Sequence, residues 1–159
     1  MTEPSSVTTR KRSRTIARMA ATQALYQCDQ TRANPESVIV EFIRHRHITP
    51  TASFEDGHIP DADLNLLEDI VRNTVSKQDI IDKTLTELLP ESWPMGRLDP
   101  VLRALLRTGI GEMMTGLPPQ VAINEYLDVA HSFFSGDEPK MVNGILDKFA
   151  RQQGGGQNT

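Results

Sequence analysis

Two short blocks near the C-terminus decide the fold: Val121-Ala-Ile-Asn-Glu125 and Val142-Asn-Gly-Ile-Leu-Asp147. Each block opens a pattern in which apolar residues recur every three or four positions, and each carries an asparagine near the start of that pattern. This spacing places the apolar side chains on one face of a helix. The two blocks therefore predict two amphipathic helices at the end of the chain.

The same periodicity runs through most of the chain and predicts an all-α fold of about seven helices. Asn34-Pro35 and Asp99-Pro100 each pair an N-cap residue with a proline in the first helical turn, which marks a helix start. No run of alternating apolar and polar residues competes with the helical pattern. The predicted helices begin near Arg14, Glu36, Asp63, Asp79, Pro100 and Asp137, with one more between Pro119 and Gly136.

Length and composition indicate one globular domain that is poor in aromatic residues. The chain has 159 residues and a mean hydropathy of −0.38, and no apolar run approaches the roughly 20 residues that cross a bilayer. Basic residues near the N-terminus are not followed by the apolar segment of a secretory signal. Cys28 is the only cysteine, so no disulfide forms within the chain, which fits a reducing cytoplasm.

The charge is distributed unevenly. Residues 1–18 hold five basic side chains and one acid, and because the whole chain carries −4, the rest carries −8. Such a basic leader is typical of an arm that contacts a polyanion, but a disordered tail that keeps the protein soluble has the same composition. We predict a flexible basic arm over residues 1–13, a single helical domain over 14–151 and a flexible tail over 152–159.

No arrangement of residues predicts catalysis, a cofactor or a metal site. His45 and His47 are two apart on a predicted helix and point to nearly opposite sides, so they cannot share a metal ion. Cys28 lies on the small-residue face of its helix and is expected in the core. Gly109-Ile-Gly111 lacks the third glycine of a dinucleotide loop and is expected to let helices pack closely. The carboxylates are scattered and expected on solvated faces, so we predict a protein that is not an enzyme.

Three segments in order along the chain resemble the NusB family: Ala21-Thr-Gln-Ala-Leu-Tyr26, Leu106-Arg107 with Glu112, and Val121 to Lys148. The resemblance implies a small all-helical protein built from two helical bundles. It also implies binding to the boxA element of nascent RNA together with NusE, a small-subunit ribosomal protein. In that family the complex helps RNA polymerase resist termination, notably during ribosomal RNA synthesis.

The resemblance also implies which residues contact RNA. An arginine-rich stretch at the N-terminus is the main contact in the family, and guanidinium groups suit phosphates and unpaired bases. Tyr26 matches a family tyrosine and fits either base stacking or a half-buried core position. The RNA-binding residues implied are Arg10, Lys11, Arg12, Arg14, Arg18, Tyr26, Lys140 and Met141.

Some positions depart from the family pattern or favour a structural role. Met141 stands where a phenylalanine is frequent, which removes a stacking ring, and Leu102 replaces an acid that could help bind NusE. Asp137 is expected to cap the last helix. A further set is expected to hold neighbouring helices together, by hydrogen bonds or close contact: Asn124, Asn143 and Gly144. The insertion over residues 49–59 is not a family feature.

Two other functions fit the sequence less well. A helical protein-interaction adaptor or homodimer would use an apolar stripe on the fifth helix, if that stripe is exposed. A NusB-like domain also precedes the catalytic domain of a ribosomal RNA methyltransferase, but no Rossmann-like domain follows in this chain, so this reading is disfavoured.

Overall fold

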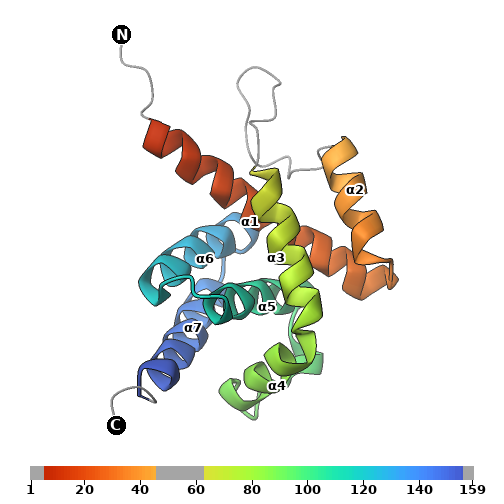
Figure 1. Cartoon of the computed structure of the whole chain (residues 1–159). Coiled ribbons are helices and arrows are strands. Elements are labelled where there is room, and N and C mark those ends of the chain that lie inside the picture. The colour runs from red at the N-terminus through yellow and green to blue at the C-terminus, as the bar shows by residue number, and fades with distance from the viewer. Residues whose placement is uncertain (1–5, 46–62, 156–159) are drawn as a thin grey trace. The chain divides into compact units, whose positions relative to one another are not determined.

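The computed structural model of the protein describes residues 6–45 and 63–155. Within those ranges seven α-helices and one short 3-10 helix follow one another, with no strand between them (Figure 1). This confirms the predicted all-α class and the number of helices. The elements are α1 (Ser6–Thr31), α2 (Pro35–His45), α3 (Leu64–Ser76), α4 (Gln78–Leu88), η1 (Met95–Arg97), α5 (Pro100–Met114), α6 (Pro119–Phe133) and α7 (Glu138–Gly155).

Short polar side chains start three of the helices, as their positions in the sequence predict. Asn34 Oδ1 accepts a hydrogen bond from the Glu36 backbone N–H at 2.8 Å. Asp63 and Asp99 accept from the backbone N–H groups two or three residues ahead, at 2.8 to 3.3 Å. These bonds satisfy backbone donors that a helix leaves without a partner at its start.

The first helix begins earlier than predicted, at Ser6 rather than near Arg14. The residues between them include no glycine or proline, and arginine and lysine are good helix formers, so the helix extends into the basic segment. The helix expected to reach His47 runs to His45, the last described residue before the gap. The insertion over 49–59 lies outside the described residues. The division into arm, domain and tail stays a prediction.

The chain divides into two compact units, residues 1–72 and 73–159, which we call unit 1 and unit 2. In unit 1, α1 packs against α2. Ala17, Ala21 and Ala24 are fully buried on α1, as their small-residue spacing predicts. The Asp63 backbone N–H donates to the Ser13 carbonyl at 3.2 Å and so ties the start of α3 to α1.

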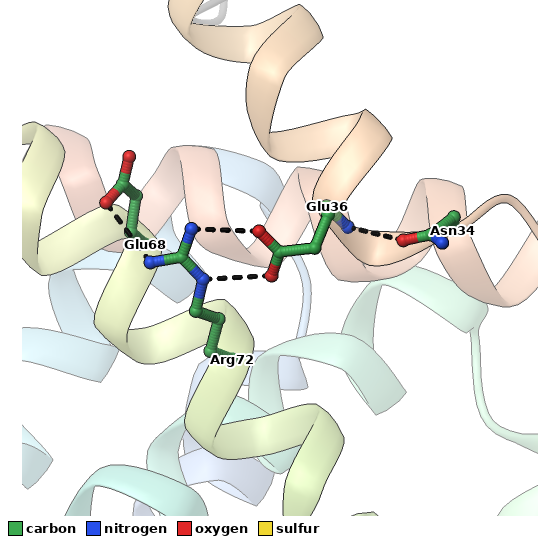
Figure 2. A network of polar contacts seen from close by, with 4 residues as sticks. All are labelled: Asn34, Glu36, Glu68 and Arg72. Atoms are coloured by element: carbon green, nitrogen blue, oxygen red, sulfur yellow. Dashed lines mark hydrogen bonds and ion pairs between the residues drawn. The ribbon is translucent and has the colours of Figure 1, made fainter.

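An exposed polar network links α2 to α3 within unit 1. Figure 2 shows Arg72 reaching from α3 to Glu36, which lies in the first turn of α2 that Asn34 caps. The Arg72 guanidinium donates to both Glu36 oxygens, at 2.8 and 2.9 Å, and to Glu68 one turn earlier at 3.3 Å. The hydrogen bonds from Arg72 hold the pKa of Glu36 below its ordinary value.

Unit 2 is built around α5, which packs against α4, α6 and α7. Two glycines allow these close approaches. A Cβ at Gly109 would lie 3.2 Å from a Leu146 methyl group on α7, and a Cβ at Gly111 would lie 3.3 Å from Ile81 Cδ1 on α4 and 3.2 Å from Thr74 Oγ1 on α3. The geometry confirms the prediction that this glycine pair serves helix packing.

One buried and one partly buried polar pair also join the helices of unit 2. The Tyr126 hydroxyl on α6 donates to Glu112 on α5 at 2.5 Å, with both side chains buried. Arg107 on α5 donates to both oxygens of Asp82 on α4, at 2.8 and 3.0 Å. The expectation that the carboxylates lie on solvated faces is therefore wrong for Glu112 and also for Glu125, which is buried. The spacing of apolar residues did not show that Tyr126 donates a hydrogen bond to Glu112. This bond offsets the free-energy cost of burying the carboxylate.

Candidate nucleic-acid interface

The start of α1 presents a cluster of exposed cations, Lys11, Arg12 and Arg14. No acidic residue occurs between Ser6 and Arg18, so nothing in this stretch neutralises them. Lys11 and Arg14 are three apart and share one side of the helix, while Arg12 points about 100° from Lys11 and about 160° from Arg14. Arg10 lies in the same helix, but its side chain falls outside the described part of the structure. These cations suit contacts to a phosphate backbone.

Arg18 does not extend that cluster. It lies four residues after Arg14, on the same side of α1, yet it is only 4% exposed. The consecutive residues from Ile16 to Thr22 are all buried, so burial here is set by position along the helix rather than by its face. The expectation of two exposed arginines side by side is therefore wrong for Arg18, whose guanidinium is not free for a phosphate in this structure.

Tyr26 lies on the same helix and is 37% exposed. It follows Arg12 by fourteen residues, which places it about 21 Å further along α1 and roughly 40° around it. Of the two predicted readings, the exposed ring fits a stacking surface better than a core position. Its RNA-binding role stays a prediction.

The start of α7 carries the other predicted contacts, Lys140 and Met141. Lys140 is exposed and Met141 is half-buried. The Asp137 carbonyl accepts hydrogen bonds from the backbone N–H groups of both, at 3.0 and 3.3 Å, and so closes the first turn. This places a flexible cation beside an apolar side chain at one helix end.

Beside Met141 lies a hollow of about 300 Å³, lined by Trp93, Asp137, Glu138 and Met141. Trp93 is 48% exposed although it is the largest apolar side chain in the protein. Trp93 was not predicted from the sequence as a site residue. Two features of the sequence could have indicated it: Trp93 is the only tryptophan of the chain, and it lies between Pro90 and Pro94, where a loop is expected.

Several residues expected to hold helices together do not do so. Asn124 and Asn143 are exposed, and Asn124 only accepts from Gln120 one turn earlier on the same helix, at 3.3 Å. Among the residues that the structure describes, a Cβ at Gly144 would meet nothing within 4 Å, so no close helix contact there depends on this glycine. Leu102 is buried, so the position offers no exposed side chain to a partner.

Most of α5 is buried, so the apolar stripe that an adaptor or homodimer would use is not exposed in this structure.

Cys28 is half-buried rather than in the core, and burial raises the pKa of its thiol. A neutral thiol is a poor nucleophile. Across 6–45 and 63–155, no group of three or more histidine, cysteine or acidic side chains could hold a metal ion. None of the helices in those ranges is long and apolar enough to cross a membrane. His47 and His58 lie outside them.

Comparison with known proteins gives one consistent result. The NusB family pattern matches residues 15–151. A protein of Gluconobacter oxydans named transcription antitermination protein NusB is 59% identical over 156 residues, which cover 98% of each chain. A protein of Granulibacter bethesdensis with the same name is 54% identical over 147 residues, or 90% of each chain.

Solved structures agree in fold. A structure of T. maritima NusB is 25% identical, with a TM-score of 0.67 over 96% of this chain and 94% of that chain. A chain in a crystal structure of antitermination factors NusB and NusE in complex with double-stranded RNA is 23% identical, with a TM-score of 0.71 over 89% of this chain and 98% of that chain. At that identity the likeness shows the fold.

Proposed function

This chain belongs to the NusB family of transcription antitermination proteins, which act without catalysis, and from that premise we propose that the exposed cations at the start of α1 are its main contact with boxA RNA. NusE is its partner, and the complex helps RNA polymerase resist termination on ribosomal transcripts. A cytoplasmic location follows from that role.

One observation carries the proposal: a helical segment without acids presents Lys11, Arg12 and Arg14 in a chain whose remainder is strongly acidic. An acidic body repels a polyanion, so RNA is drawn to this segment. Tyr26 further along α1 offers a ring on which an unpaired base stacks. Lys140 adds a cation in unit 2.

Affinity for RNA is modest without NusE. Each neutralised phosphate of single-stranded RNA contributes about −0.7 to the log–log salt slope, so three cations give a slope near −2. When a partner protein also contacts the RNA, the second contact forms within the same complex at a high effective concentration, so the RNA binds more tightly. We therefore expect NusE to tighten boxA binding well beyond either protein alone.

Fluorescence anisotropy of labelled boxA RNA with NusE tests this. Lys11→Ala/Arg12→Ala/Arg14→Ala should lose most of the binding and flatten the salt slope by about 2. The charge-matched control replaces three exposed cations elsewhere, Arg44, Lys83 and Arg151, with alanine. Equal loss in both variants, or equal binding of a scrambled RNA, would contradict the proposal. Arg18→Ala is unsuitable because Arg18 is buried.

The reading as a methyltransferase domain finds no support, because the Gluconobacter relative matched over 98% of both chains is named an antitermination protein.

A further inference from the structure

The hollow between Trp93 and the start of α7 is formed by residues of unit 2 alone. Its volume of about 300 Å³ lies at the lower end of the range of small-molecule sites. The Trp93 backbone is fixed on both sides: its N–H donates to the Pro90 carbonyl at 2.9 Å, and Pro94 follows with φ −67°. A stiff loop therefore holds the half-exposed indole at the hollow, which limits the entropy lost when a ligand binds.

The lining combines an apolar wall with negative charge. Trp93 supplies an aromatic ring and Met141 a polarisable thioether, while Asp137 and Glu138 are acidic. Asp137 is exposed, and among the described residues its carboxylate accepts no hydrogen bond and forms no ion pair. Lys140 follows Asp137 by three residues, but it is exposed and does not line the hollow. The lining therefore offers a carboxylate and an aromatic face together, and both attract an organic cation.

The surroundings of the hollow favour a small ligand over a protein partner. A stable protein interface buries about 800 Å² on each partner, around an apolar core. Among the described residues, the other exposed large apolar side chains of unit 2 are Ile80 and Val121, and neither lines the hollow. Trp93 is therefore one wall of a small hollow and does not belong to a large apolar patch.

We propose that this hollow binds a small aliphatic diamine, with one ammonium group over the Trp93 ring, its methylene stem along Met141 and the other ammonium group paired with Asp137. The negative face of an indole attracts an ammonium ion, and the methylene groups leave water when they lie against the apolar wall. Glu138 adds to the negative potential of the site without a direct contact. A neutral chain of the same length gains only the contact of its stem.

The inference goes beyond the proposed function, because the site needs neither RNA nor NusE. Trp93 is the only tryptophan, so its emission reports on the hollow without a label. The diamine 1,4-diaminobutane is titrated into the protein alone, and sodium chloride keeps the ionic strength constant. We expect a saturable change of emission with a dissociation constant in the millimolar range, because few contacts hold the ligand.

Two related compounds separate the contributions of charge and stem. Butylamine has the same stem with one ammonium group, so it should bind about threefold more weakly than the diamine. The diol 1,4-butanediol has the stem without charge, and it should give no saturable change of Trp93 emission.

Variants are compared by the shifts of backbone amide signals in NMR spectra, a readout that does not need the tryptophan. Asp137→Asn should weaken binding of the diamine about threefold. Trp93→Leu keeps an apolar side chain without the aromatic face and should weaken binding about fivefold, while Trp93→Phe should fall between it and the wild type. The control Asp128→Asn removes an exposed acid of α6 outside the lining and should bind as the wild type does. Circular dichroism checks that each variant folds.

Each outcome supports or overturns the inference. Saturable binding that is weakened by Asp137→Asn and not by Asp128→Asn supports it. An equal change of emission with 1,4-butanediol would show an effect of the solvent and overturn it. Equal binding to both asparagine variants would place the diamine elsewhere on the acidic protein and overturn it as well. Since RNA and NusE are absent from the experiment, neither failure bears on the proposed contact between α1 and boxA RNA.

Discussion

Arg72 in unit 1 and Arg107 in unit 2 make nearly the same contact in two different surroundings. Each donates to both oxygens of a carboxylate on a neighbouring helix, at 2.8 to 3.0 Å. The side chains of Arg72 and Glu36 are 49% and 59% exposed, whereas those of Arg107 and Asp82 are 11% and 32% exposed. Geometry alone therefore does not set the contribution of an ion pair, because water screens the exposed pair around Arg72 more strongly than the partly buried pair around Arg107.

The two units also differ in how their helices are joined. In unit 2, α5 is held by buried apolar side chains, close glycine contacts and buried polar pairs. In unit 1, the link from α2 to α3 includes an exposed network around Arg72. We therefore expect unit 2 to tolerate changes of salt and pH that weaken this link in unit 1.

The largest effect is expected from the centre of unit 2. Leu105→Ala should lower the free energy of unfolding by about 3 kcal/mol, because Leu105 is fully buried on α5 and the cavity left behind cannot collapse completely. Urea denaturation followed by circular dichroism measures the change. Ile80→Ala is the control, since Ile80 is 56% exposed, and a comparable loss there would mean that burial is not the cause.

Arg107→Gln should come next, with a loss of about 2 kcal/mol. The substitution removes a partly buried pair and leaves Asp82 without its two hydrogen bonds from the guanidinium. The loss should change less between low and high salt than it does for Arg72, because the pair is only partly exposed to water. A loss that vanishes in high salt would place Arg107 in the same class as Arg72 and remove the contrast between the two units.

The helices and most of their starts, though not that of α1, were predictable from the sequence, because local rules govern them. Apolar spacing shows which face is buried, and Asn34, Asp63 and Asp99 cap helices as short polar residues do. The close packing at Gly109 and Gly111 was also predicted. The caps and the apolar faces depend on residues within a few positions of one another, whereas the partners of the two glycines, Leu146 and Thr74, lie far away in the sequence.

The features that failed depend on segments far apart in the sequence. Arg18 has the same local setting as Arg14, and only the tertiary packing decides that it is buried. Trp93 and Glu138 meet in one hollow although 45 residues separate them in the sequence. Gly144 was expected to let two helices touch, but in the described part of the chain a Cβ there would meet nothing within 4 Å. The spacing of apolar residues does not show contacts between distant segments. The candidate site was therefore predicted on α1, and Trp93 was missed.

Arg72→Gln should cost less than Arg107→Gln, and its cost should shrink in high salt. The effect should also depend on pH. Because Arg72 lowers the pKa of Glu36 in the folded protein, the pair adds stability above the ordinary Glu value of 4.5 and loses it as pH falls through the lower folded value.

A double-mutant cycle with Glu36→Gln, at pH 7 and pH 3, measures this coupling. The coupling should be present at pH 7 and nearly absent at pH 3. Equal coupling at both values would show that the contact between α2 and α3 does not depend on the charge of Glu36.

The smallest effect is expected at the end of α1, and it has the opposite sign. Arg32 adopts φ 58°, in the left-handed region that favours glycine, and its backbone N–H donates to the Cys28 carbonyl at 2.8 Å to close the helix. Arg32→Gly relieves the crowding of the Cβ but gains freedom in the unfolded chain, so the net stabilisation should be about 0.5 kcal/mol. Lys83→Gly, inside α4, should instead destabilise by about 1 kcal/mol. If both substitutions destabilise the protein, the backbone at Arg32 is not strained, and glycine at this position does not raise the free energy of unfolding.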